Sequence, residues 1–217
     1  MLKLTNRSIL RTVGLLTTLV VAYLLPMHPD ALGAPGVGGS GLSKDDLNTI
    51  INQAVAGANI TVSPLRSLPA VQRTTKMQIA IVGRDGKLLA YFAMQDAWVG
   101  SEDIAIAKAR TAVFFSSDEN ALTSRIIGVL SQAHNPDGSD GAGPLWGIGN
   151  SNQVGISGNQ STRNGIITFP GGVALYKDGK LVGAIGVSGD GVDQDEAVAF
   201  AGAAGFLPGP SVAKLGY

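Results

Sequence analysis

Two stretches of the chain place short apolar runs on either side of an Asp-Gly pair. Residues 77–94 (MQIAIVGRDGKLLAYFAM) and residues 171–189 (GGVALYKDGKLVGAIGVSG) both have this pattern. Asp and Gly tolerate the positive φ angles of a tight turn, so each stretch predicts a β-hairpin. A helix that opens with acids follows each hairpin, at residues 101–115 (SEDIAIAKARTAVFF) and from Asp193 onward. The pattern predicts an α+β domain in which an antiparallel sheet is covered by alanine-rich helices.

The remaining segments complete this outline. Apolar residues recur at helical spacing after Ser43, a plausible N-cap, and predict a first helix that ends near Gly57. Residues 120–131 (NALTSRIIGVLS) predict a short helix. Residues 132–170 are rich in Gly, Asn, Ser and Asp and predict a long loop. Compact domains seldom carry so long a loop without a function, so we expect it to border a ligand cavity.

The helix at residues 101–115 is apolar on nearly every side but contains Lys108 and Arg110. Neither cation has an acid three or four residues away, so no ion pair within the helix is available. Their side chains could reach water from the rim of the helix, pair with an acid across a subunit interface, or bind the carboxylate of a ligand. We expect the sheet to cover one face of this helix and a second subunit to cover the other.

The N-terminus has the features of a signal peptide. Basic residues precede an uncharged apolar run from Val13 to Leu25, which is shorter than the ~20 residues of a membrane span. Small residues at Ala31 and Gly33 then suit a signal peptidase. We expect residues 1–33 to be a signal peptide, 34–42 a flexible linker and 43–217 the folded domain, located in the periplasm or secreted. A retained N-terminal anchor is the alternative; after cleavage we expect no stable membrane insertion.

Composition removes several classes of function. The formal charge is zero, with 16 basic and 16 acidic residues, so no global field attracts nucleic acid. Cysteine is absent, which excludes disulfides and thiolate metal sites. The glycines of residues 186–191 stand in the wrong order for a dinucleotide loop, and residues 135–146 lack the final Glu of a calcium loop. His134 is the only histidine left after cleavage.

Several of these segments together resemble a known family. They are IAIVGRDGKLLAYFAM, SEDIAIAKARTAVFF, SSDENALTSR and FPGGVALYKDGKLVGAIGVSGDGVDQDEAVAFAG, and the resemblance extends from Ser43 to Gly205. This succession is similar to the GlcG/HbpS-like heme-binding domains, sometimes labelled heme-degrading. The resemblance implies a three-layer, profilin-like α+β domain with an antiparallel sheet of about five strands flanked by helices. It also implies symmetric homo-oligomers, binding of heme or a related tetrapyrrole, and a link to iron.

The resemblance also directs attention to possible heme ligands. Some relatives ligate iron through a histidine near the first helix, where this chain has only Asn48, Asn52 and Gln53. The remaining candidates for the iron are His134, Met77, Met94 and Tyr91. Lys108 and Arg110 would suit the two propionates.

These observations favour an exported protein that binds heme or another small ligand and takes part in heme or iron handling or sensing. No nucleophile paired with a base is visible, which favours binding over catalysis. Two alternatives stay open: an enzyme that acts on heme or a small organic acid, and an oligomeric interaction module without a ligand.

Overall fold

The first helix begins where its capping residues predict. The computed structural model describes residues 41–67, 69, 73–135, 137–148 and 166–217, and α1 (Lys44–Ile60) follows Ser43. Ser43 and Asp46 form a capping box, in which each side chain accepts the backbone N–H of the other. Lys177 donates to the same Asp46 carboxylate at 2.6 Å. The hydrogen bonds from Lys177 and then Ser43 lower the pKa of Asp46 to about 2.

Both predicted hairpins are confirmed. They form β1 (Gln78–Gly83) with β2 (Leu88–Ala93), and β4 (Gly172–Lys177) with β5 (Lys180–Ser188). At the turns Gly86 has φ 76°, Asp178 52° and Gly179 75°. The central strands β1 and β5 pair antiparallel, which joins the hairpins into one sheet of order β2-β1-β5-β4.

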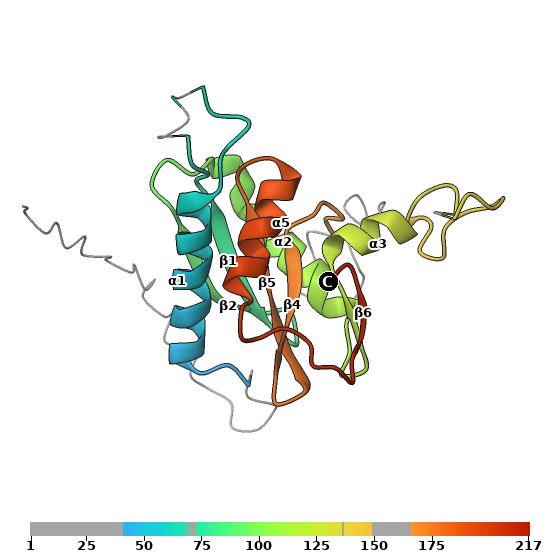
Figure 1. Cartoon of the computed structure of the whole chain (residues 1–217). Coiled ribbons are helices and arrows are strands. Elements are labelled where there is room, and N and C mark those ends of the chain that lie inside the picture. The colour runs from blue at the N-terminus through green and yellow to red at the C-terminus, as the bar shows by residue number, and fades with distance from the viewer. Residues whose placement is uncertain (1–40, 68, 70–72, 136, 149–165) are drawn as a thin grey trace, which may run out of the picture. The chain divides into compact units, whose positions relative to one another are not determined.

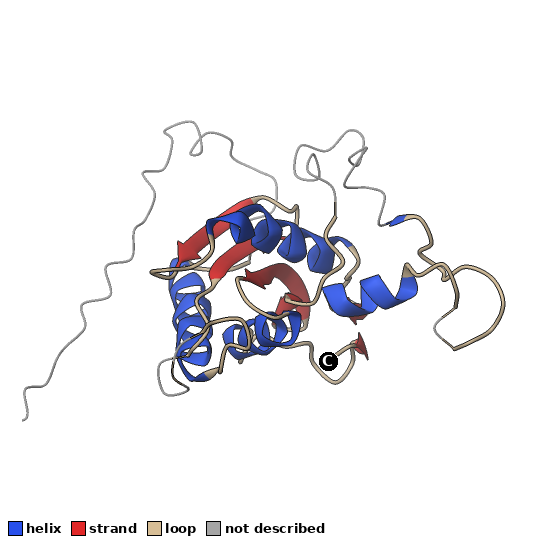
Figure 2. Cartoon of the chain, turned by 90° about the horizontal axis from the view of Figure 1, so that it is seen from above, coloured by secondary structure: helices blue, strands red, loops and turns tan. Residues whose placement is uncertain are grey.

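The sheet is the middle of three layers, as the resemblance implied (Figures 1 and 2). Against one face lie α1 and α5 (Val192–Gly202), and a core that includes Ile50, Ile79 and Val198 fills the space between. On the other face lies α2 (Glu102–Phe114), preceded by the short 3-10 helix η2 (Val99–Ser101). The core on this side includes Val82 and Ala112. Side chains alternate between the two faces along each strand, so the sheet has one hydrophobic core on each face.

The helix α2 lies directly on the backbone of the sheet because two strand positions have no side chain. A Cβ atom added to Gly172 would overlap the carbonyl oxygen of Lys108, and one added to Gly186 would overlap that of Ala105. The side chains of α2 at this contact are also small, because several of its buried residues are alanines. Such close approach leaves almost no space for a larger side chain at either glycine.

The described residues contribute four strands to the antiparallel sheet, which was expected to have about five. One expectation needs correction. The residues expected to start a helix at Asn120 instead form β3 (Asn120–Leu122), which pairs parallel with β6 (Ala213–Leu215); the helix α3 spans only Ser124–Leu130. Tertiary pairing with a distant segment overrides the local apolar pattern here.

The surface of α2 away from the sheet is partly covered by the chain itself. Thr111 is fully buried, and its hydroxyl donates to the carbonyl of Ile167 at 2.8 Å. The segment around Ile167 therefore covers part of the helix surface that the sequence assigned to a second subunit.

Candidate functional site

Lys108 is buried inside the domain and pairs with an acid of its own chain. Its side chain is 1% exposed, and Nζ donates to Asp195 Oδ2 at 2.7 Å, the Val187 carbonyl at 3.1 Å and Ser188 Oγ at 3.4 Å. The expectation that Lys108 reaches water, a neighbouring subunit or a ligand is therefore wrong. Its partner lies 87 residues later, on α5, so helical spacing could not reveal it.

This ion pair is the centre of a buried polar network. Asp195 Oδ1 also accepts the backbone N–H of Asp190 at 3.0 Å, and Ser188 Oγ donates to Ser101 Oγ at 3.3 Å. Burial lowers the pKa of Lys108 and raises that of Asp195, and the opposite charge of each partner counteracts both shifts. The network connects α2, β5, α5 and the end of η2.

Arg110 differs from Lys108 because it remains half-buried. Its Nε donates to the Gly86 carbonyl in the β1–β2 turn at 3.1 Å, and no carboxylate of the described residues lies within ion-pair distance. Burial lowers its pKa, an effect that the charge of Asp103 opposes. Lys108 and Arg110 were the two predicted propionate partners. Of these, only Arg110 has a side chain that reaches the surface.

Tyr91 of β2 and Met94, the residue after the end of β2, point to opposite faces of the sheet. Tyr91 pairs with Ala80 on the α2 side and hydrogen-bonds through its hydroxyl to Gln78 Oε1. Burial and the nearby acids Glu102 and Asp103 raise its pKa to about 12, so the phenol keeps its proton at neutral pH. Met94 lies in the core of the α1 side, where its sulfur accepts the backbone N–H of Met77 at 3.4 Å. The two methionine candidates are thus turned away from solvent.

His134 is exposed and follows α3, in a segment that extends away from the sheet (Figures 1 and 2). The structure therefore does not bring the five predicted residues His134, Tyr91, Met94, Lys108 and Arg110 into one site. The predicted loop 132–170 includes residues 136 and 149–165, which lie outside the described residues. Its place beside a ligand cavity stays a prediction.

One end of the domain presents a surface that the sequence reasoning missed, named here the apical surface. Several segments meet there. Arg66 Nη2 donates to the Asp96 carbonyl at 2.8 Å, and Thr75 Oγ1 donates to the Ala58 carbonyl at 3.0 Å. A Cβ atom on Gly191 would lie 3.2 Å from Pro64, which places the start of α5 beside the same loop. We define the apical surface by Ile60, Val62, Leu65, Arg66, Arg73, Lys76, Trp98, Val99 and Val192.

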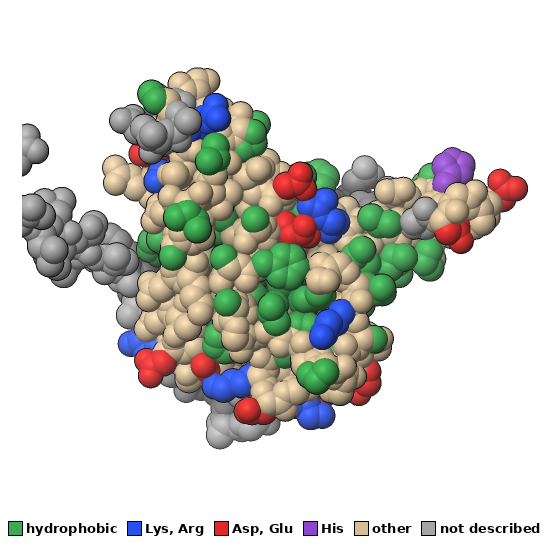
Figure 3. Space-filling view, viewed as in Figure 1, with side chains coloured by type: hydrophobic (Ala, Val, Ile, Leu, Met, Phe, Trp, Pro, Cys, Tyr) green, Lys and Arg blue, Asp and Glu red, His purple; other side chains and the backbone are tan. Residues whose placement is uncertain are grey.

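The apical surface exposes several apolar side chains, and Figure 3 shows separate apolar groups at this end of the domain among polar atoms. It holds six of the eleven large hydrophobic residues that are exposed in the described part of the chain. Among them Trp98 is 62% exposed and Val99 77%. The backbone beneath Trp98 is fixed, because its carbonyl accepts hydrogen bonds from Gln78 Nε2 and the Ser101 N–H. Exposed apolar side chains gathered at one end of a domain make that end a candidate binding site.

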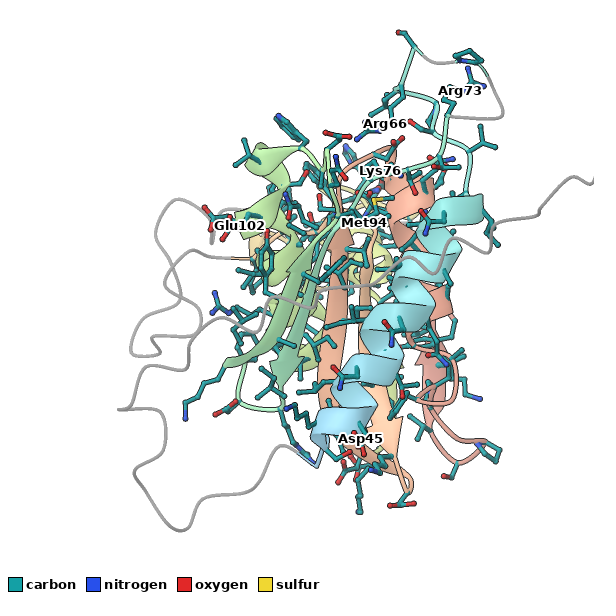
Figure 4. All side chains as sticks on the ribbon, turned by 90° about the vertical axis from the view of Figure 1, so that its left-hand side faces the viewer. Asp45, Arg66, Arg73, Lys76, Met94 and Glu102 are labelled. Atoms are coloured by element: carbon teal, nitrogen blue, oxygen red, sulfur yellow. The ribbon has the colours of Figure 1, made fainter. Side chains whose placement is uncertain are left out.

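Three cations without a carboxylate partner share this end of the domain. Figure 4 places Arg66, Arg73 and Lys76 at the same end of the domain. None has an ion pair among the described residues, and the buried Nε atoms of both arginines have no hydrogen-bond acceptor there. An apolar surface beside unpaired guanidinium groups can bind an amphipathic anion. The sequence contained a signal for these unpaired cations, since residues 47–84 contain four basic residues and no acidic one.

A metal site and a membrane span are both missing from what the structure describes. No three His, Asp or Glu side chains of the described residues are grouped so that they could hold a metal ion. Within the same residues, no helix is long and apolar enough to cross a bilayer.

Comparison with known protein families identifies the fold. A family model described as haem degrading protein HbpS-like matches residues 67–204. The chain belongs to the HbpS-like family. The match includes both hairpins, α2 and α5, and therefore the whole four-stranded sheet. It also includes most of the apical surface, from Arg73 to Val192.

Two proteins of Citrobacter freundii are similar to this chain in sequence. The chain is 31% identical over 134 residues to the corrinoid adenosyltransferase PduO of Citrobacter freundii, a match that covers 60% of this chain and 33% of PduO. It thus spans about a third of that enzyme. A 15.0 kDa protein from the dhaT-dhaS intergenic region of the same organism is 27% identical over 155 residues, covering 69% of this chain and 93% of that protein.

Solved structures agree with this assignment. The crystal structure of a PduOC–heme complex has a TM-score of 0.55 and 26% identity, covering 77% of this chain and 96% of PduOC. The Klebsiella pneumoniae protein ORFY has a TM-score of 0.52 and 21% identity, covering 80% of this chain and 95% of ORFY. The likeness to ORFY concerns the fold alone.

Proposed function

We propose that this HbpS-like protein is exported and binds heme, or a closely related tetrapyrrole, in heme or iron handling or sensing. Membership of a family described as haem-degrading and the likeness to a PduOC–heme complex support the ligand class. The observation that carries the proposal is the apical surface, where exposed apolar side chains lie beside unpaired arginines. Heme combines an apolar ring with two carboxylates at one edge, so it matches both parts of this surface.

The described residues fit the ring and the propionates better than the iron. Trp98 and Val99 offer apolar contact to the ring, while Arg66 and Arg73 can donate to carboxylates. Met94, one of the predicted iron ligands, turns its sulfur into the core. Binding here would therefore depend on the ring and its carboxylates.

The first experiment is a titration of the purified protein with heme, followed by the Soret band. We expect saturable binding in the parent. The double variant Arg66→Ala/Arg73→Ala should raise the Kd at least about ten-fold, because each lost charge-assisted hydrogen bond is worth roughly 1.5–3 kcal/mol. Lys44→Ala, an exposed cation at the other end of α1, is the matched control and should leave the Kd unchanged.

Two further measurements complete this test. Heme with both propionates esterified should bind the parent and the double arginine variant equally, because the groups that the arginines bind are then uncharged. His134→Ala tests the predicted ligand role of that histidine and should leave the Soret band in place. A parent without saturable binding, or arginine variants with the parent's Kd, would refute the assignment.

The enzyme alternative has its own readout. If the protein degrades heme, a reductant added to the complex should remove the Soret band and release iron. A band that persists under reducing conditions supports binding alone. Export is tested separately by intact-mass analysis of secreted or periplasmic protein, which should lack residues 1–33; material that retains Met1 would contradict cleavage.

A further inference from the structure

Trp98 on the apical surface is exposed, but its own chain holds it in place. The residue is 62% exposed, yet its carbonyl accepts hydrogen bonds from Gln78 Nε2 at 3.0 Å and from the Ser101 N–H at 3.1 Å. A Cβ atom built on Gly100 would lie 2.7 Å from Cζ2 and 2.9 Å from Cε2 of the indole. The six-membered ring of the indole therefore lies against the main chain at Gly100.

The side chain that holds the Trp98 carbonyl is itself held by a second hydrogen bond. Gln78 is 4% exposed, and its Oε1 accepts a hydrogen bond from the Tyr91 hydroxyl. The amide thus turns its oxygen toward Tyr91 and its nitrogen toward Trp98. A buried amide oxygen that loses its donor is costly, so the orientation of Gln78 depends on Tyr91. Through Gln78, the Tyr91 hydroxyl stabilises the backbone beneath Trp98.

The turn before Trp98 also holds a cation. Asp96 in this turn has φ 63°, a left-handed conformation that is uncommon for residues other than glycine. Its carbonyl accepts Arg66 Nη2 at 2.8 Å, and the Ala97 N–H donates to the Met94 carbonyl at 3.0 Å. The carbonyl that holds the Arg66 guanidinium is thus two residues from Trp98 in the same turn. A ligand can contact both groups without first having to order this turn.

We propose that Trp98 is a stacking platform that makes the apical surface selective for flat, conjugated macrocycles, and that Gln78 and Tyr91 are its positioning residues. This inference rests on the proposed binding of heme or a related tetrapyrrole. An indole packs against a conjugated ring in an offset stack, which requires a flat partner. A side chain that is already fixed in the free protein loses little freedom on binding, so its contact contributes more to affinity.

The first test compares two ligands that carry the same two propionates. Metal-free protoporphyrin has a flat ring, whereas biliverdin is an open, twisted chain. The parent should bind protoporphyrin at least about ten-fold more tightly than biliverdin. Trp98→Ala should raise the Kd for protoporphyrin about ten-fold and leave the Kd for biliverdin within about two-fold. Trp146→Ala removes an indole that is 61% exposed and lies outside the apical surface, so as the matched control it should change neither Kd.

The second test follows the indole without any ligand. In a Trp146→Phe background Trp98 is the only tryptophan, since the chain contains two. Its fluorescence anisotropy decay should show an indole that moves with the whole domain, although it is exposed. Tyr91→Phe and Gly100→Ala should each add a fast local motion and raise the Kd for protoporphyrin about three-fold. Gly209→Ala, whose added Cβ meets no atom within 4 Å, is the control for both measurements.

The outcomes separate this inference from the proposed function. A parent that binds heme and protoporphyrin, with the Kd unchanged in Trp98→Ala, overturns the stacking role alone. Equal Kd values of the parent for protoporphyrin and biliverdin overturn the selectivity. An indole that already moves freely in the parent overturns the positioning roles whatever the ligand. A parent that binds no tetrapyrrole refutes the proposed function and this inference together.

Discussion

Removal of the Lys108 ammonium should destabilise the domain more than any change of a surface charge. Lys108→Met keeps most of the side-chain volume but leaves the Asp195 carboxylate, 2% exposed, with only the Asp190 N–H as a partner. Breaking a buried ion pair in this way costs about 3–5 kcal/mol. Domains of this size are stable by about 5–15 kcal/mol in total, so the loss amounts to about a fifth of the stability or more.

Urea unfolding followed by circular dichroism measures this effect. With a slope of about 2 kcal/mol per molar urea, the midpoint should fall by about 2 M. Lys87→Met is the control, because Lys87 forms an exposed ion pair with Asp85 and should cost under about 1 kcal/mol. A double variant Lys108→Met/Asp195→Leu should recover much of the loss, since no buried charge then remains unpaired. If Lys108→Met stays within about 1 kcal/mol of the parent, the account of the ion pair is wrong.

Three further predictions concern other contacts. The Asp46 carboxylate has a folded pKa of about 2, below its ordinary value of 3.8, so its contribution is present above pH 4 and disappears as the pH falls toward 2. Asp46→Asn should therefore lower stability by about 1 kcal/mol at pH 7 but not at pH 2, and exposed Asp45→Asn should do neither. Tyr217→Phe should cost about 1–2 kcal/mol in urea unfolding, because it removes both hydrogen bonds to Ala174. Gly186→Ala should lower the melting temperature by several degrees, because the added methyl group overlaps the backbone of α2.

Features encoded within a few residues could be predicted from the sequence. The Asp-Gly turns, the N-cap at Ser43 and the apolar period of α1 each depend on neighbours in the chain. These local signals were sufficient for both hairpins and for a sheet covered by helices, whereas the three-layer arrangement was implied by the family resemblance. They failed at Asn120, where an apolar run pairs with a strand from the C-terminal segment.

The candidate site was harder to predict because its parts come from distant segments. Lys108 lacked a visible partner only because Asp195 lies on another helix. The apical surface combines the end of α1, the loop around Arg66, the turn before Trp98 and the start of α5. No local pattern connects these segments, and the one available signal was the long stretch without an acidic residue.

The strand order has a consequence for how this protein folds. The two hairpins can each form early, because their partners are adjacent in the chain. The central contact between β1 and β5 has to wait, since it pairs Gln78 with Ser188 across a long intervening segment. Closing so large a loop slows folding, so the docking of the two preformed hairpins should limit the rate. Until then the inner edge of β1 is open, and the intermediate is the species most exposed to aggregation.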